Sequence, residues 1–267
     1  PPRSTLFPYT TLFRSVKATL NAPDTLDPHF MVASATMEFS LNVYDSLLSH
    51  DPNDPTVLAP SLSTQVPSIE NGLIKVASSG ATSISFPIRS NVKFHSGHTL
   101  SAQDVAYTFK RGILQGGEVA VIKMLTLNLI GANSFSDLAK EIGYDAAFKK
   151  LDDSITVSGN VVTFHLVKPF VPFLELMADN GSSASIFSKA WCIEQGDWPG
   201  TKETGQAFMS MKMEDDKLFK KMNGTGPYKF VTWEPGQRLV FEAFKEHWKG
   251  APKLDRVIVR LITDPQT

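Results

Sequence analysis

The chain has 267 residues, 42% of them hydrophobic and 20% charged, which is enough to bury the core of one large domain or two small ones. Its 26 basic and 27 acidic residues form no long runs, so the composition argues against nucleic acid or an anionic membrane surface as a partner. The single cysteine, Cys192, excludes an internal disulfide and lies in an apolar setting typical of a buried residue, and no apolar stretch approaches the ~20 residues of a membrane span.

Residues 1–15 show neither helical nor strand periodicity. Their sequence, PPRSTLFPYTTLFRS, resembles the translation of a common short-read sequencing adapter along its whole length. We therefore expect residues 1–15 to be a non-native stub and exclude them from the fold, as one excludes the scar of a fusion. A disordered native tail is the alternative, and only the DNA context distinguishes the two.

The regular pattern begins with a strand at residues 16–20, which alternate in hydrophobicity. A loop follows from Pro28, because the residue before a proline is pushed out of the helical region. Apolar residues then recur at three- and four-residue steps, which predicts an amphipathic helix over residues 36–48. The predicted inner face of this helix consists of Met37, Leu41, Tyr44 and Leu48.

A strand and a helix are predicted next. Residues 83–89 have the period-two pattern of a half-buried strand, in which Pro87 suggests an edge or a bulge. The apolar face of this strand consists of Ile84, Phe86 and Ile88. Ser101 followed by Asp104 is the signal of a helix N-cap, and Gly116 ends that helix. Its inner face consists of Val105, Ala106, Phe109 and Ile113.

Two hairpins are predicted in the second half of the chain. Residues 155–166 and 228–243 each contain two alternating strands around a turn. A helix is predicted to begin at Pro169 and to continue to Met177, and a last strand covers residues 257–261. Short strands and helices without a strict βαβ rhythm predict a mixed α+β architecture.

No segment carries a complete catalytic or metal-binding motif. His95 and His98 stand on a glycine-containing turn without other ligand-type residues nearby, so we predict turn-lining histidines rather than a metal site. Paired acids at Asp152 and Asp153 and at residues 214–216 lie in polar stretches, where solvation or helix capping explains them better than acid–base catalysis. We therefore expect neither an enzyme nor a cofactor.

Several segments together resemble the bacterial extracellular solute-binding proteins of family 5, the peptide-, oligopeptide- and nickel-binding components of ABC importers. The most specific segment is FPIRSNVKFHSGHTLSAQDVAYTF at residues 86–109, which is similar to the strand, turn and helix that mark the family. Shorter matches are LDP at 26–28, VYDSLL at 43–48, LAPSLS at 58–63, GTGPY at 224–228 and WKG at 248–250. In this order and spacing, they cover nearly all of the chain after residue 15.

The resemblance implies an α/β fold of the type II periplasmic binding protein kind, of which this chain forms the first lobe only. It places that lobe at residues 16–257, with an inserted subdomain at about 50–168, and takes 258–267 as a hinge strand leading to a missing second lobe. In such proteins the ligand lies between two lobes that close by hinge motion. We therefore expect an incomplete cleft, exposed apolar surface and little or no tight binding by the fragment.

By family position, the cleft-facing residues come from three loops in which small or apolar side chains dominate. These residues are Met31, Val32, Ala33, Ser34, Met124, Gly181, Ser182, Ser183 and Ala184. They suit apolar contacts and backbone hydrogen bonds to an extended peptide. The strand, turn and helix of residues 86–109 are expected to be structural rather than ligand-binding.

The implied function is that of a monomeric transport receptor with no nucleic-acid partner. It captures an oligopeptide or other small solute in the periplasm or at the cell surface, with a lipid anchor as an option in the intact protein, and presents it to ABC permease subunits. Two alternatives stay open. A secreted hydrolase requires a serine, a histidine and an acid together in a cleft, and a sensory module of a regulator requires a DNA-binding domain in the intact gene.

Overall fold

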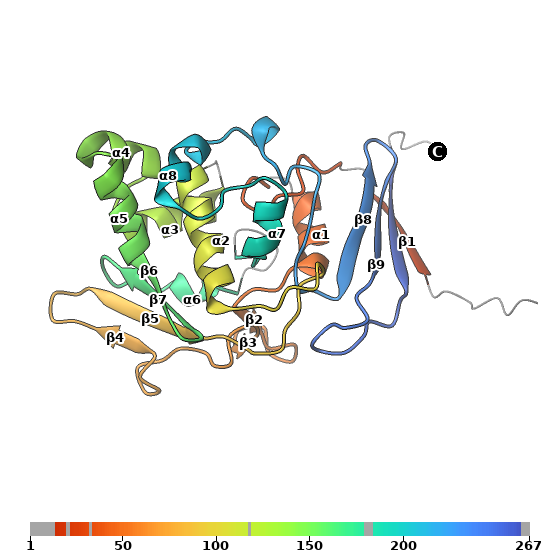
Figure 1. Ribbon diagram of the computed structural model, residues 1–267. Coiled ribbons are helices and arrows are strands. Elements are labelled where there is room, and N and C mark those ends of the chain that lie inside the picture. Colours follow the sequence, from red (N-terminus) through yellow and green to blue (C-terminus); the bar gives the residue numbers. More distant parts are fainter. Residues whose placement is uncertain (1–13, 20–21, 32–33, 117–118, 179–183, 263–267) are drawn as a thin grey trace, which may run out of the picture.

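The computed structural model describes residues 14–19, 22–31, 34–116, 119–178 and 184–262, and its named strands form three separate sheets (Figure 1). A terminal sheet is built from strands near both ends of the chain. A middle sheet is built from two strand pairs, and β2 (Leu48–His50) pairs with β3 (Leu58–Pro60) in the third sheet. In Figure 1, α1 stands between the terminal sheet on the right and the middle sheet with its helices on the left. The fold is mixed α/β, as predicted.

The terminal sheet has the order β1-β10-β9-β8. Its strands are β1 (Arg14–Thr19), β8 (Tyr228–Glu234), β9 (Arg238–Ala243) and β10 (Arg256–Leu261), which confirms the predicted first strand, second hairpin and last strand. β1 and β10 run parallel, so that Val16 lies opposite Ile258. Strand β1 begins at Arg14 and thus includes the last two residues of the expected stub, while residues 1–13 lie outside the described residues.

Helix α1 (Ser34–Val43) covers one face of the terminal sheet, and it differs from the predicted helix in both its end and its inner face. The ring of Phe39 lies 6.0 Å from that of Phe241 on β9, and Phe39 and Val43 are buried, whereas Leu41 is 47% exposed. The prediction failed because the sheet packs on the side of Phe39 and Val43. The chain then leaves the helix and becomes extended at β2.

The middle sheet has the order β4-β5-β7-β6 and confirms the predicted strand and first hairpin. Its strands are β4 (Ile74–Val76), β5 (Thr82–Pro87), β6 (Ile155–Ser158) and β7 (Val161–Leu166), all antiparallel to their neighbours. Alternate residues of β5 and β7 are buried, Ile84 and Phe86 among them. Pro87 pairs with Val161 beyond the end of β4, so its missing N–H costs no bond to that strand.

Helix α2 (Ala102–Gln115) lies on the middle sheet, with the ring of Phe109 at 5.1 Å from that of Phe164. Its predicted start is confirmed, because the Asp104 carboxylate accepts hydrogen bonds from the backbone N–H of Ser101 (2.9 Å) and from its hydroxyl (2.6 Å). The helix ends at Gly116, as predicted. The four inner-face residues predicted for it are all buried.

Three further helices, α3 (Ala120–Ile130), α4 (Phe135–Ile142) and α5 (Tyr144–Ser154), connect α2 to β6. They were not predicted from the sequence. The predicted helix from Pro169 to Met177 is only α6 (Phe173–Leu176), because Val171 precedes Pro172 and is thereby kept out of the helical region. The remaining elements are α7 (Lys189–Glu194), α8 (Lys202–Gly205) and the 3₁₀ turns at Gln206–Phe208 and Met213–Asp215.

Within the described residues, no single helix is both long and apolar enough to span a membrane. One bent pair, Ala102–Gln115 with Ala120–Ile142, reaches the required length and composition. The α2 part of this pair has its apolar residues buried against the middle sheet, as expected for a core helix.

Candidate functional site

A cleft of about 1030 Å³ opens beside the C-terminal end of α2. One wall is formed by α3 and the first turn of α4, and the other by residues 210–214, which lie nearly a hundred residues further along the chain. Phe30, from the loop before α1, also lines the cleft. A second hollow, between α1 and the terminal sheet, has about 80 Å³ and is too small for a solute larger than a few atoms.

The lining of the cleft is mixed, with apolar side chains beside polar and charged ones such as Lys123, Thr126 and Asp137. Three methionines contribute to it, Met124 from one wall and Met211 and Met213 from the other. Methionine side chains are flexible and polarizable, so they adapt to ligands of different shapes. The polar groups include the side chain of Gln115 on the floor.

The residues predicted to face a ligand fall into three groups. Met124 lines the cleft and is 37% exposed. Met31 is buried next to the lining residue Phe30, and its thioether sulfur accepts a hydrogen bond from Ser40 Oγ at 3.1 Å. Ala184 is buried as well, and Ser34 is the first residue of α1. The other predicted residues, Val32, Ala33, Gly181, Ser182 and Ser183, lie outside the described residues.

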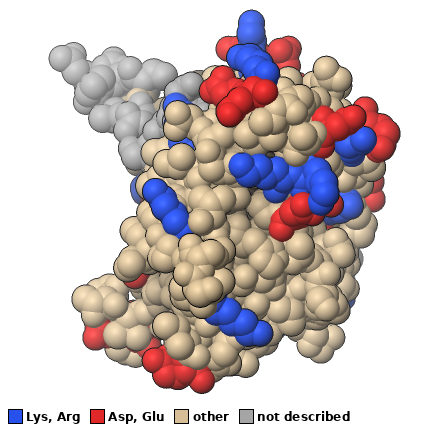
Figure 2. Space-filling view, turned by 90° about the vertical axis from the view of Figure 1, so that its left-hand side faces the viewer, with Lys and Arg blue, Asp and Glu red and all other residues tan. Residues whose placement is uncertain are grey.

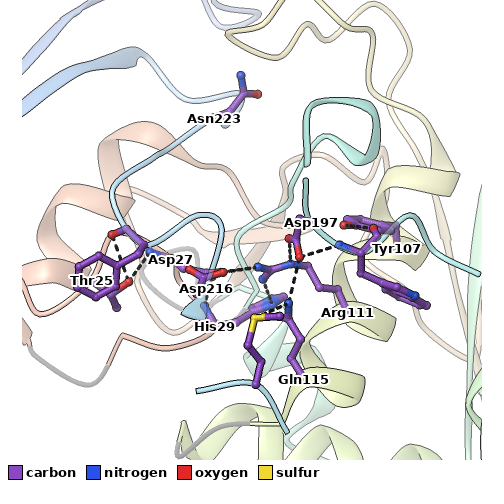
Figure 3. Close-up of polar contacts among 12 residues, drawn as sticks. Thr25, Asp27, His29, Tyr107, Arg111, Gln115, Asp197, Asp216 and Asn223 are labelled. Carbon is purple, nitrogen blue, oxygen red and sulfur yellow. Dashed lines mark hydrogen bonds and ion pairs between the residues drawn. The ribbon is translucent and has the colours of Figure 1, made fainter. Parts of the chain in front are cut away.

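Adjoining the cleft lies a buried polar cluster around Arg111 of α2 (Figure 3). The guanidinium donates to the carboxylates of Asp27 (2.6 Å) and Asp216 (3.2 Å) through Nη2 and to that of Asp197 through Nε. Its Nη1 lies 3.1 Å from Nδ1 of His29, which therefore accepts. All of these side chains are buried.

The charges of this cluster do not balance, because one arginine faces three carboxylates. Burial acts to raise the pKa of Asp27, but the charge of Arg111 and the hydrogen bonds from Arg111 and the His29 backbone N–H hold it below its ordinary value. Burial, followed by the charge of Asp27, raises the pKa of Asp216 to about 8. Asp216 is therefore the carboxyl that keeps a proton at neutral pH, which reduces the net negative charge of the cluster.

The Arg111 cluster ties two segments that line the cleft to α2. Asp27 belongs to the loop that carries Phe30, and Asp216 lies two residues beyond the wall of residues 210–214. Gln115, which also lines the cleft, connects to the cluster, since its Nε2 donates to Asp197 Oδ1 at 3.2 Å. Removing the arginine would leave Asp27, Asp197 and Asp216 without their common partner.

The sequence did not reveal this cluster. Asp216 was expected to be solvated or to cap a helix, and this was wrong because it is buried against Arg111. The expectation is confirmed for Asp152 and Asp153, whose exposed carboxylates pair with lysines. On the helix, Arg111 neighbours Tyr107, Thr108, Leu114 and Gln115, and nothing in this local sequence identifies its distant partners.

His95 and His98 have separate partners, and Cys192 is buried as predicted. His95 Nε2 lies 2.8 Å from the carbonyl oxygen of Gly226, and burial lowers the pKa of His95 to about 4. His98 has different partners, with its Nε2 at 3.4 Å from Glu194 Oε1. Among the described residues, no group of three or more metal-ligand side chains occurs. Cys192 is fully buried, and burial raises the pKa of its thiol.

Charged side chains are mixed in sign on the face of α4, α5 and α8. Figure 2 shows basic and acidic residues interspersed on this side of the molecule, separated by wide uncharged areas. Lys140 pairs with Asp137, and Lys202 pairs with Asp145. This face therefore offers no basic patch to a polyanion.

Comparison with known proteins places this geometry in a family context. The model of the family described as bacterial extracellular solute-binding proteins, family 5 (middle part), matches residues 68–267. A di/tripeptide-binding protein 2 from Pseudomonas aeruginosa is 24% identical over 252 residues, which is 91% of this chain and 40% of that protein. Heme-binding protein A from Haemophilus influenzae is 24% identical over 259 residues, 94% of this chain and 40% of that protein.

Among solved structures, the oligopeptide-binding protein AppA from Bacillus subtilis, in complex with a nonapeptide, superposes with a TM-score of 0.63 at 21% identity. The match covers 94% of this chain and 40% of that one. This chain thus spans about two fifths of the length of the proteins it matches. At this identity the structural similarity establishes the fold alone.

Proposed function

Because the chain belongs to the bacterial extracellular solute-binding proteins of family 5, we propose that it is the first lobe of a receptor that captures an oligopeptide for an ABC importer. The family consists of substrate-binding proteins and not of enzymes, as predicted. The receptor would act in the periplasm or at the cell surface and deliver its solute unchanged to the permease subunits.

The observation that carries this proposal is the cleft beside the end of α2. It is large enough for a short peptide, its lining combines apolar with polar side chains, and it contains Met124 beside the loop of Phe30 and Met31. An extended peptide needs such a surface together with backbone donors and acceptors, which loops supply without regard to the peptide's side chains. We extend the proposed ligand-facing set to the loops at residues 31–34 and 181–184.

The proposed domain organisation remains that of one lobe at residues 16–257 with an inserted subdomain at about 50–168. The middle sheet and helices α2 to α5 all fall within that inserted range, which supports a separate structural unit. Strand β10 at the far end of the chain pairs with β1, and we propose that residues 258–267 lead into a hinge. The length of the relatives supports a second lobe that completes the cleft.

A thermal-shift screen tests this function. The full gene product containing this chain is heated with di- to pentapeptides and, separately, with sugars. A solute that binds only the folded state stabilises it by RT ln(1 + [L]/Kd), about 2.7 kcal/mol at a hundredfold excess over Kd. We expect peptides to raise the melting temperature and mass spectrometry to recover them uncleaved. A rise with sugars alone, or cleavage of the peptides, would contradict the proposal.

A further inference from the structure

Gln115 is the last residue of α2 and lies where the Arg111 cluster meets the cleft. Its side chain is fully buried, yet it belongs to the lining of the cleft. A buried amide in such a position has four hydrogen-bonding sites to satisfy, two donors on nitrogen and two acceptor positions on oxygen. The neighbours of Gln115 determine which of these four sites face the protein and which face the cleft.

The orientation of this amide is fixed by Asp197. Gln115 Nε2 donates to Asp197 Oδ1 at 3.2 Å, and the other oxygen of the same carboxylate binds Arg111. An ionised carboxylate only accepts hydrogen bonds, so the amide cannot be flipped to turn its oxygen toward Asp197. Gln115 Oε1 therefore lies on the side away from the carboxylate.

Among the described residues, Gln115 Oε1 has no hydrogen-bond partner, although it is buried. A buried acceptor without a donor costs about 1–3 kcal/mol, and native proteins leave few of them. Met124, Met211 and Met213, which line the same cleft, carry no N–H or O–H group that could serve as this donor. A donor brought by a molecule in the cleft would remove this cost.

The amide nitrogen contacts a flexible side chain. Met211 Sδ lies 4.0 Å from Gln115 Nε2, on the cleft wall of residues 210–214. Methionine has three rotatable bonds and repacks easily, so an incoming ligand can displace it without a change in the backbone. The displaced thioether would then pack against apolar parts of the same ligand.

We infer that Gln115 Oε1 accepts a hydrogen bond from an N–H group of the bound solute, while the methionines pack along an apolar group next to it. This inference rests on the proposed function and adds the ligand chemistry: a donor flanked by apolar atoms, as in the backbone amide of a peptide with small apolar side chains. Sugars, whose hydroxyls surround the whole molecule, fit this site less well. Gln115 thus helps to determine specificity.

The test uses the full gene product, with trialanine and its derivatives methylated at one backbone nitrogen as probes in calorimetry. Gln115→Met keeps the length of the side chain and removes the acceptor, and we expect it to weaken trialanine binding about tenfold. Gln195→Met is the matched control, because Gln195 lies outside the cleft and accepts from Lys221 instead. The affinity of Gln195→Met for trialanine should equal that of the wild type.

Methylation at the recognised nitrogen should weaken binding to the wild type about tenfold and have no further effect in Gln115→Met. This comparison of ligands on the wild type does not depend on how well any variant folds. Two results would overturn the inference and leave the proposed function standing. One is equal affinity of Gln115→Met and the wild type for trialanine, and the other is an equal loss of affinity on methylation in both proteins. A wild-type protein that binds no peptide would overturn the proposed function and the inference with it.

Discussion

Arg111 binds side chains from three other segments of the chain, and all of its partners are more than 80 residues away in sequence. An arginine in this position can form several hydrogen bonds at once, because its planar guanidinium carries five N–H donors. Burial makes each of these bonds strong and makes the loss of any partner costly. The residue therefore ties the loop of Asp27 and the turn of Asp216 to α2.

The raised pKa of Asp216 predicts a specific pH dependence of stability. This carboxyl holds its proton more tightly in the folded state than at its ordinary pKa of 3.8, so the free energy of unfolding should fall as pH rises from about 4 to about 8. Asp216→Asn mimics the protonated form, and its stability relative to the wild type should rise across that window, with a slope below about 1.4 kcal/mol per pH unit.

Urea unfolding of both proteins between pH 5 and pH 9 measures this difference. Asp27, Arg111 and Asp197 face this carboxyl, and they are the same in the two proteins. Asp215→Asn is the control, because Asp215 is the exposed neighbour of Asp216, and its difference from the wild type should not vary with pH. A constant difference for Asp216→Asn would mean that Asp216 is already ionised at pH 5.

At the residue scale, the sequence predicted what depends on near neighbours. The Ser101–Asp104 cap joins residues three positions apart, and the burial of Cys192 follows from the apolar residues beside it. The Arg111 cluster depends instead on which loops the fold brings together, and no spacing in the sequence encodes this. Asp216 was misjudged for that reason, since its immediate neighbours are charged and solvated.

At the element scale, the end of α1 is held by the turn at Gly224 to Gly226. A Cβ on Gly224 would lie 2.0 Å from the carbonyl oxygen of Val43 and 2.7 Å from the Tyr44 ring, both of which are buried. We expect Gly224→Ala to lower the free energy of unfolding by about 3 kcal/mol or more, because backbone cannot move aside as a side chain can.

Gly72→Ala is the matched control for this prediction. Gly72 has a φ of 73°, but nothing lies within 4 Å of its Cβ position, so only the backbone strain of about 1–2 kcal/mol applies. Chemical denaturation of both variants compares the two costs. Equal costs would show that the turn at Gly224 moves away from α1 freely.

The elements that could be predicted are those whose pattern shows in the local sequence. Strands β5, β7, β8 and β9 were found because alternation shows directly in the sequence of a half-buried strand. Helix α1 was predicted to end five residues too late, because its end is set by packing against the terminal sheet and the Gly224 turn. Helix α3 was missed because its sequence is apolar on most sides and shows no clear period.

At the scale of the whole molecule, the family could be identified from the sequence because its marking segments lie on the rigid junction of β5 and α2. The full lining of the cleft could not be identified from the sequence, because its walls come from positions near 30, 124 and 211. Only the folding of the chain brings these positions together. Binding is a property of both walls together. A single substitution on one wall should therefore change affinity more than stability.

Met124 tests this expectation. Met124 is partly exposed on the cleft wall, so Met124→Glu should change the free energy of unfolding by less than about 0.5 kcal/mol. The same substitution should weaken trialanine binding at least tenfold, because the new carboxylate would lose its water beneath the bound peptide. Leu41→Glu adds the same charge on α1, outside the cleft lining, and should leave affinity unchanged. Calorimetry on both variants separates a local effect from an effect of net charge. An equal loss of affinity for trialanine in both variants would show that Met124 is not part of the binding surface.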